Sequence, residues 1–176
     1  MEWSYIRFEK SIEKVTYTTK IPKKKFLSSG NYPIISQEAE FINGYWDNKD
    51  DVFDITDPVV IFGDHTKVVK HIDFNFVLGA DGVKVLKPIN ELNSRFFAYF
   101  LESAPVADLG YARHYRLLKE ISVPLPPIPE QKRIVAILDQ AFADIEQARA
   151  KTEQNLKNAR ELFESYLQQV FSQRGE

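Results

Sequence analysis

The hydrophobic and polar positions divide the chain into two parts with different periods. Before residue 124, short apolar runs such as 59–62 and 74–78 alternate with glycine- and aspartate-containing turns at 63–64 and 79–82. Short apolar runs between turn-forming residues are typical of β-strands joined by tight turns. One helix is expected in this part, near 92–102. The first part is therefore predicted to be mixed but mostly β.

The second part has the period of a helix. From 130 to about 171 the chain contains no glycine or proline and is rich in Ala, Glu, Gln, Lys and Leu. We predict one helix of about 42 residues, or roughly 63 Å at 1.5 Å per residue. Its apolar positions alternate between spacings of four and three, as in a coiled-coil seam. The seam, the predicted dimerisation surface, consists of Ile134, Leu138, Ala141, Ile145, Ala148, Thr152, Asn155, Ala159, Leu162 and Tyr166.

A seam of this length needs a partner. A domain of about 125 residues is too small to cover it, so we expect the far end to pack on another chain. Thr152 and Asn155 are polar seam residues near the helix midpoint, and such residues usually fix register. In an antiparallel homodimer they would meet their symmetry mates on the two-fold axis. A parallel pair would instead place both globular domains at one end, and we favour the antiparallel arrangement.

These patterns predict an α+β chain with a globular domain over 1–128 and a long helix over 129–176. The boundary lies at the run PLPPIP, residues 124–129, because proline neither continues a helix nor donates to a central strand. We interpret the run as a stiff link that fixes the entry angle of the helix, with Glu130 near the positive helix end. A polyproline ligand is the alternative, since the PxxP spacing is present.

Composition narrows the function classes. The 176 residues include no cysteine, which excludes disulfides, thiolate zinc sites and thiol nucleophiles and favours a cytoplasmic location. Charges interrupt the N-terminal MEWSYIRFEKS where a signal peptide needs an apolar core, and no run approaches the roughly 18 apolar residues of a membrane span. Lys plus Arg is 23 and Asp plus Glu is 25, a net charge of -2. Any DNA binding must therefore use local basic patches.

Residues 121–139, ISVPLPPIPEQKRIVAILD, carry a family resemblance. They resemble the segment that ends each target recognition domain in the specificity subunits of Type I restriction-modification systems. Upstream, FLSSGNYPII at 26–35 is similar to the early turn and strand of that family, and 57–87 is similar to its central hairpins. The resemblance spans nearly the whole chain.

The resemblance implies a non-catalytic subunit that recognises half of a bipartite double-stranded DNA target and docks the adenine methyltransferase and restriction subunits, with no cofactor of its own. Members usually carry two recognition domains and two such helices, whereas this chain has one of each. It would be a half-length form, natural or excised. Dimerisation would then restore the second domain, and a two-fold pair should read palindromic half-sites. The sequence contains neither an Asn-Pro-Pro-Tyr motif nor a Walker phosphate-binding loop.

DNA contact needs donors on loops: Arg or Lys for phosphate and guanine, and small polar side chains for mixed contacts. Three clusters supply them. The first comprises Lys20, Lys23, Lys24, Lys25, Ser28, Ser29 and Asn31, the second His65, Thr66, Lys67 and Lys70, and the third Tyr111, Arg113, His114 and Arg116. The structural alternatives are a solvated charge run, an ordinary hairpin, and an ion pair of the third cluster with Asp108 or Glu120, respectively.

Metal and nuclease sites are disfavoured. The carboxylates at 47, 50, 51 and 54 resemble a calcium loop, but Val52 stands where that loop needs glycine. His65 and His71 lack a third ligand, and Asp64 with Lys67 lacks a recognisable second acid of a nuclease. No metal site and no catalytic residue are therefore predicted.

Two rival classes remain. A coiled-coil adaptor would bind peptide and show no salt-dependent, sequence-specific DNA binding, and a stand-alone nuclease would cleave DNA with a metal. For the recognition subunit, the helix positions expected to face either the methyltransferase or solvent are Lys132, Arg133, Arg149 and Lys151.

Overall fold

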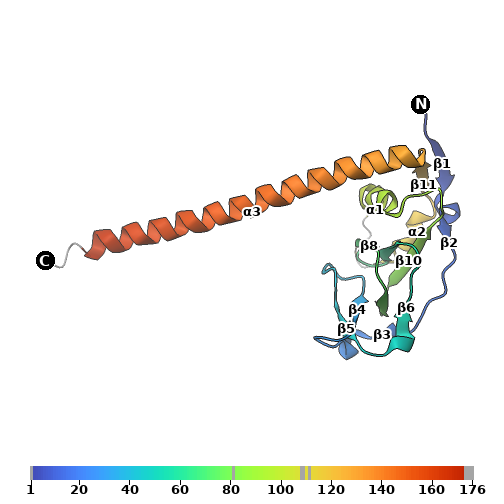
Figure 1. The fold of residues 1–176 in the computed structure, drawn as a ribbon, viewed down its shortest axis with the longest axis horizontal. Coiled ribbons are helices and arrows are strands. Elements are labelled where there is room, and N and C mark those ends of the chain that lie inside the picture. The colour runs from blue at the N-terminus through green and yellow to red at the C-terminus, as the bar shows by residue number, and fades with distance from the viewer. Residues whose placement is uncertain (1, 81, 108–109, 111, 173–176) are drawn as a thin grey trace. The chain divides into compact units, whose positions relative to one another are not determined.

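The fold is mixed, with a mostly β part followed by one long helix, as the α+β expectation states (Figure 1). The computed structural model describes residues 2–80, 82–107, 110 and 112–172. The chain divides into two compact units, Met1–Val135 and Ala136–Glu176. The first unit therefore includes the first turns of the long helix, beyond the proline run.

In the described residues of the first unit, the strands form three sheets. The central sheet is antiparallel, with the order β2 (Ile12–Glu13), β10 (Val83–Pro88), β7 (Val59–Gly63) and β8 (Val69–Ile72). The second has the order β3 (Lys20–Ile21), β9 (Phe76–Gly79), β4 (Tyr32–Ile35) and β5 (Gly44–Trp46), and β6 (Val52–Phe53) also pairs with β9. The third pairs β1 (Ser4–Arg7) with β11 (Ser122–Leu125).

Buried strands and one helix make the core. β7 is buried along its whole length, because it lies between two neighbouring strands and both of its faces are covered. On one side, Phe62 packs with Phe97 of α1 (Ser94–Ser103), the helix expected near 92–102. On the other, Ile61 packs with Phe76 of the second sheet. This core holds the ends of the strands, and the loops between them, in fixed positions.

Short helical segments complete the first unit. They are α2 (Tyr115–Leu118) and the 3-10 turns η1 (Phe8–Lys10), η2 (Lys23–Lys25) and η3 (Lys49–Asp51). Asn93 caps α1, since its Oδ1 accepts from the main-chain N of Arg95 at 3.1 Å and of Phe96 at 2.9 Å.

The proline run serves both a strand and a helix start. Pro124 lies in β11, opposite Tyr5, where proline is tolerated because β11 has only one neighbour, β1. The long helix α3 (Ile128–Ser172) begins inside the run, so Pro129 occupies its first turn, where the missing N–H has no helical acceptor anyway.

Gln131 anchors the start of α3 within the first unit. Its side chain is fully buried. Nε2 donates to the carbonyls of Glu91 (2.8 Å) and Pro126 (2.7 Å), and Oε1 accepts from the main-chain N of Asn93 (2.7 Å). One side chain thus joins the helix start, the proline run and the cap of α1.

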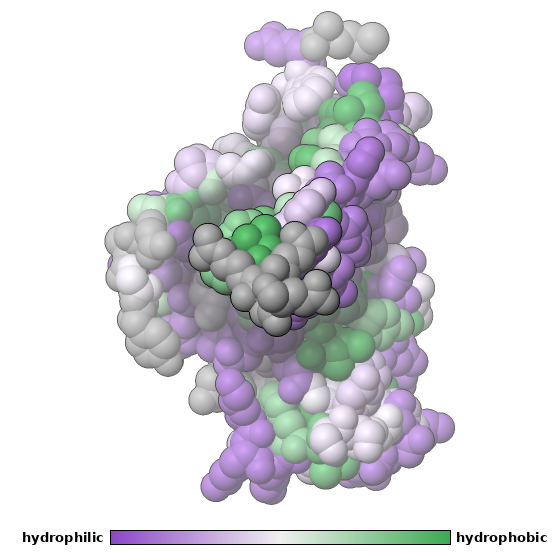
Figure 2. Space-filling model, turned by 90° about the vertical axis from the view of Figure 1, so that its left-hand side faces the viewer, coloured by the Kyte–Doolittle hydropathy of each residue, from purple (hydrophilic) through white to green (hydrophobic). Residues whose placement is uncertain are grey.

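The helix α3 is continuous over 45 residues, about 68 Å at 1.5 Å per residue. The expected long helix is confirmed, with a start two residues earlier. Every described residue from 140 to 172 is exposed, including Ile145 at 59%, Leu162 at 58% and Tyr166 at 59%. Figure 2 shows the hydrophobic and hydrophilic residues of the helix gathered on different sides. Within the described residues, no helix is long and apolar enough to cross a membrane.

Candidate nucleic-acid interface

The second and third predicted clusters meet at Asp64, the residue that follows β7. The main-chain O of Asp64 accepts from His114 N at 2.7 Å and lies 3.1 Å from His114 Nδ1, which must donate because a carbonyl only accepts. Its Oδ1 accepts from the main-chain N of Tyr115 at 2.9 Å. The β7–β8 turn and the start of α2, distant in the sequence, therefore lie side by side.

Gln37 holds the same turn from the other direction. Its Oε1 accepts from His65 N at 3.1 Å, and its main-chain O accepts from the Thr66 hydroxyl at 2.7 Å. The main-chain N of Lys67 closes the turn by donating to Gly63 O at 2.9 Å. Lys67 has a φ of 59°, which residues other than glycine rarely adopt. Both ends of the turn are thus fixed to neighbouring segments.

Two glycines permit this close packing. A Cβ on Gly63 would lie 2.2 Å from the Thr66 Oγ1 and 2.9 Å from the Gln37 Cβ. Gly82 has a φ of +73°, and a Cβ there would lie 2.5 Å from the Gln37 Oε1. Only glycine fits either position without a shift of Gln37 or of the turn.

The residues around this turn form what we call the Asp64 surface. Thr66, Arg113 and Arg116 are exposed, and the others are partly exposed. Lys84 lies 3.7 Å from the Asp64 carboxylate and 5.2 Å from the centre of the Tyr115 ring. The surface consists of Gln37, His65, Thr66, Lys67, Lys84, Arg113 and Arg116. Its basic side chains and small polar groups match the hydrogen-bond donors that DNA phosphates and the edges of nucleobases require.

The first cluster is divided between solvent and protein partners. Lys24, Lys25, Ser28 and Ser29 are exposed. The Lys23 ammonium lies 3.3 Å from Glu38, next to Gln37 in the chain. Lys20 Nζ donates to Val83 O at 3.0 Å, and Asn31 donates from both N and Nδ2 to Asp47 Oδ1. Lys20 and Asn31 are therefore engaged within the protein.

Lys70 lies in the interior, only 4% exposed. Its ammonium donates to the carbonyls of Ser36 (3.0 Å) and Glu40 (2.5 Å) and to Asn43 Oδ1 (3.1 Å). Burial lowers the pKa of Lys70 from its ordinary 10.5 to about 8, although Glu40 and Glu38 oppose that shift. Lys70 thus holds the loop over 36–43, and its expected role in DNA contact does not fit this position.

His114 is the other interior member of the predicted set. It is 1% exposed, and both its N and its Nδ1 face the Asp64 carbonyl. It joins the two loops rather than facing solvent. Tyr111 lies outside the described residues, as does Asp108, the alternative ion-pair partner of the third cluster.

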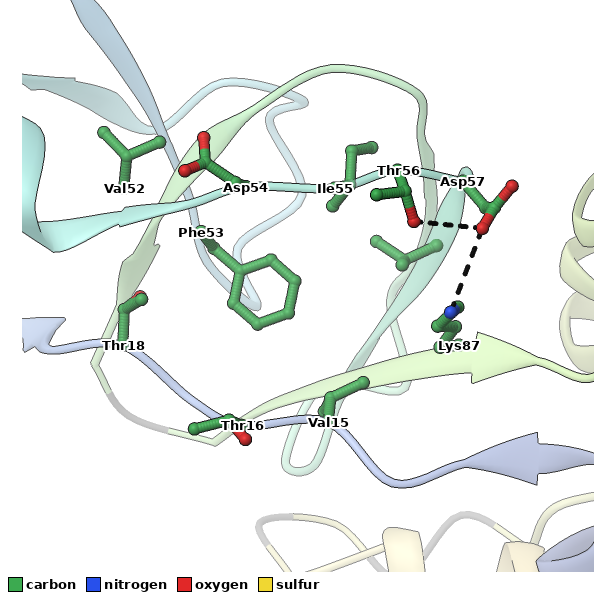
Figure 3. A pocket seen from close by; sticks show the side chains of 11 residues that line it. Val15, Thr16, Thr18, Val52, Phe53, Asp54, Ile55, Thr56, Asp57 and Lys87 are labelled. Carbon is green, nitrogen blue, oxygen red and sulfur yellow. Dashed lines mark hydrogen bonds and ion pairs between the residues drawn. The ribbon is translucent and has the colours of Figure 1, made fainter.

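Two grooves on the first unit are poor matches to a phosphate backbone. One groove has a volume of about 430 Å³, and its apolar lining includes Phe53 and Val59 (Figure 3). Its charged lining residues are two carboxylates, Asp54 and Asp57, and one basic residue, Lys87. Lys87 lies 2.9 Å from Glu13 and 3.8 Å from Asp57, and its contact with Glu13 raises the pKa of Lys87. The larger groove, near the proline run, is also lined by acidic side chains, Glu2, Glu91 and Glu130.

The carboxylates and histidines considered for metal binding point to different partners. Asp51 accepts from Trp46 Nε1 at 2.9 Å, which is the main reason that the pKa of Asp51 is lowered. Asp54 accepts from Asn75, and His71 Nε2 lies 2.9 Å from the Ser94 hydroxyl. Over the part of the chain that the structure describes, no three His, Cys, Asp or Glu residues are grouped as a metal would need.

Three residues that build the Asp64 surface are not predicted as such from the sequence. Asp64 is predicted only as a turn residue of the second cluster or as a nuclease acid, and Gln37 and Lys84 belong to none of the predicted clusters. Their partners lie between 20 and 51 positions away along the chain: Lys84 to Asp64, Gln37 to Thr66, and Asp64 to Tyr115. The one local signal was the pair of turn glycines, Gly63 and Gly82, which mark close backbone approach.

Known proteins share this fold. The family model described as the Type I restriction modification DNA specificity domain matches residues 10–155. The Type I restriction enzyme EcoR124I/EcoR124II specificity subunit of Escherichia coli is 26% identical over 137 residues, which cover 70% of this chain and 34% of that protein. The chain thus spans about a third of the length of that relative.

Solved structures agree in fold. A chain from a study of the complex assembly and conformational transition of the type I R-M system has a TM-score of 0.66 at 22% identity, covering 89% of this chain and 43% of its own length. The S subunit from M. genitalium gives 0.62 at 18% identity over 83% of this chain and 40% of that one. The HsdS subunit from Thermoanaerobacter tengcongensis gives 0.55 at 18% identity, over 82% and 38%. The chain belongs to the Type I restriction-modification DNA specificity domain family.

Proposed function

We propose that this chain recognises one half of a bipartite DNA target for a Type I restriction-modification complex and has no catalytic role itself. Residues 1–128 would read the DNA, and residues 129–176 would dimerise and set the spacing. The observation that carries the proposal is the convergence of the turn over 65–67 with Arg113 and Arg116 at Asp64. Family membership over residues 10–155 supports it.

The Asp64 surface suits both parts of DNA recognition. Arg113 and Arg116 can bind phosphate or the O6 and N7 edge of guanine, and Thr66 and Gln37 supply small polar groups for mixed contacts. The lysines at 23–25 are exposed, Lys23 lies 3.3 Å from Glu38, and the three would contribute phosphate contacts. Because the net charge of the chain is -2, attraction to DNA must come from these local basic side chains.

A second copy of the chain would read the other half-site of the DNA. The chain covers 34% to 43% of its full-length relatives, and its seam is exposed from residue 140 onward. We propose an antiparallel homodimer in which Thr152 lies opposite Asn155 of the second copy. The same register sets Ile145 opposite Leu162 and Ala141 opposite Tyr166. Polar residues then meet polar ones, and Ala141 meets the larger Tyr166, which favours this register.

Engineered cysteines test orientation and register directly, because the chain has no cysteine of its own. The double variant Ile145→Cys with Leu162→Cys should cross-link two copies on oxidation, whereas each single variant should not. In a parallel dimer each single variant would cross-link instead, since every seam residue would face its own mate. Cross-linking of the single variants would therefore contradict the antiparallel pair.

The same helix offers a place for the methyltransferase. Leu156, Phe163 and Val170 are 54%, 64% and 57% exposed, and they recur every seven residues directly beside the seam. A helix with two apolar rows packs against two neighbours. We assign the second row to a methyltransferase helix, and the resulting complex would carry the restriction subunit. Phe163→Glu should abolish co-purification with the methyltransferase and keep the dimer, whereas the neighbouring Glu164→Ala should change neither.

The four basic helix residues expected at a partner or in solvent are partly used locally. Arg133 lies 2.8 Å from Glu130, and Arg149 lies 3.1 Å from Glu153. Lys132 and Lys151 are exposed. Such surface pairs add little to stability, so these four residues remain available to a partner.

The experiment that tests the whole proposal is co-expression of this chain with its methyltransferase, followed by mapping of methylated adenines across the host genome. A split palindromic motif is the expected result. An asymmetric motif would require a second recognition chain and would contradict the homodimer. Absence of methylation, with the methyltransferase shown to bind DNA and the methyl donor, would favour the adaptor class.

A further inference from the structure

Asp64 is the point at which three separate segments meet. Its main-chain N donates to Gly82 O at 2.7 Å, in the turn before β10, and its main-chain O accepts from His114 N at 2.7 Å. Its two carboxylate oxygens contact different segments: Oδ1 accepts from Tyr115 N at 2.9 Å, and Oδ2 lies 3.7 Å from Lys84 Nζ.

The burial of this carboxylate is costly unless its charge is compensated. The Asp64 side chain is 6% exposed, and the Lys84 side chain is 33% exposed. A buried carboxylate is stable only with hydrogen bonds and an opposite charge, which Tyr115 N and Lys84 provide here. In return, the Asp64 carboxylate fixes the main-chain N of Tyr115 and restrains one ammonium on the surface.

The two fixed main-chain groups are flanked by the exposed arginines. Arg113 precedes His114, whose N is bound to Asp64, and Arg116 follows Tyr115, whose N is also bound to Asp64. The Asp64 side chain restrains this backbone through Tyr115 N, in addition to the main-chain bond from His114 N, which any residue at position 64 would keep. Base contacts depend on such placement, whereas attraction to phosphates depends mainly on charge.

We propose that Asp64 is a positioning residue for DNA target recognition, which holds Arg113 and Arg116 in register with the turn over 65–67 and neutralises Lys84. This inference rests on the proposed function. Loss of the Asp64 carboxylate removes no basic residue from the chain, but it releases Tyr115 N and Lys84 and so loosens the placement of the two arginines. Sequence-specific binding should therefore fall, while binding to unrelated DNA stays the same or becomes tighter.

The test measures the specificity ratio, the affinity for target DNA divided by the affinity for a scrambled duplex. The target is the duplex carrying the motif found by methylation mapping, and the chain is used in its complex with the methyltransferase. Asp64→Ala should lower the ratio about 10- to 100-fold, as expected for one misplaced bidentate contact. Asp64→Asn keeps an oxygen for Tyr115 N but cannot neutralise Lys84, so its ratio should fall about three- to tenfold.

A matched control removes the same charge elsewhere. Asp57 is 66% exposed and lies 3.8 Å from Lys87, so Asp57→Ala changes the net charge equally without touching the Asp64 surface. Its ratio should stay within twofold of the unmodified protein. If Asp64→Ala fails to fold, Asp64→Asn carries the test.

The outcomes separate the two proposals. If the unmodified complex shows no target preference, the proposed function fails and this inference fails with it. If the unmodified complex is specific and the Asp64 variants keep its ratio within twofold, only the positioning role is overturned. An equal loss of affinity for target and scrambled DNA would indicate a merely structural role and would also overturn it.

Discussion

Replacement of Gln131 by methionine removes three hydrogen bonds while nearly keeping the shape of the side chain. Gln131 is fully buried and bonds the main chain of Glu91, Asn93 and Pro126 at 2.7–2.8 Å. Each main-chain group left without a partner in the interior costs about 1–3 kcal/mol. With partial relaxation toward water, we expect Gln131→Met to lower the free energy of unfolding by about 3–5 kcal/mol. That is a large fraction of the 5–15 kcal/mol typical of a domain.

Gln131→Glu should be worse still near neutral pH. The carboxylate can accept from Asn93 N, but it cannot donate to the carbonyls of Glu91 and Pro126, and it would bury a charge. Both effects raise the pKa of the introduced carboxyl above its unfolded value. The variant then has its full free energy of unfolding below the pKa of the carboxyl in the unfolded chain, about 4.3, and loses it as the pH rises through the raised pKa of the folded state. The variant should therefore regain stability on acidification relative to Gln131→Met.

Urea unfolding followed by tryptophan fluorescence measures this effect in the first unit, because both tryptophans, Trp3 and Trp46, lie there. Lys132→Met, at the exposed neighbouring position, is the control and should stay within about 0.5 kcal/mol of the unmodified protein. A Gln131→Met variant as stable as this control would refute the reasoning that the amide pins the helix start.

Three further predictions follow from buried or polar positions. The pKa of Lys70 is lowered to about 8, so up to about pH 10.5 the native state binds fewer protons than the unfolded state. The free energy of unfolding in urea should therefore rise by about 2 kcal/mol from pH 7.5 to 9.5. An equal rise in the Lys70→Met variant would contradict this explanation. Gly82→Ala should lose about 1–2 kcal/mol more than Gly110→Ala by thermal unfolding, since both have positive φ but only Gly82 has Gln37 within 4 Å of an added Cβ; equal losses would exclude the contact. Asn155→Leu should stabilise the proposed dimer in sedimentation but allow other registers, so the Ile145–Leu162 cysteine pair should cross-link less completely.

The long helix and its approximate ends could be predicted because its signals are local. Period, propensity and the absence of glycine and proline all act within a few turns, and the helix begins at Ile128, two residues before the glycine- and proline-free segment that predicts it. The strands β7 and β9 and the helix α1 were likewise marked by apolar runs and turn glycines.

The buried polar contacts could not be predicted, because they depend on partners far along the chain. Lys70 was grouped with DNA-contacting residues, but the oxygens that hold its ammonium come from the loop 27 to 34 positions earlier. Gln131 belongs to the segment that carries the family resemblance, yet nothing local indicates that its amide bonds Asn93, 38 positions away. Periodicity shows which face is apolar, but it does not show which polar side chain fills a gap between loops.

The exposed seam of α3 makes the lifetime of the free chain depend on its concentration. A helix with Ile145, Leu162 and Tyr166 in water has little packing to hold it, so the isolated chain should fray and be accessible to proteases along 140–172. Partner binding stabilises the helix by mass action. Because the proposed partner of the seam is a second copy of the chain, chain made at low concentration should be degraded faster than chain made at high concentration.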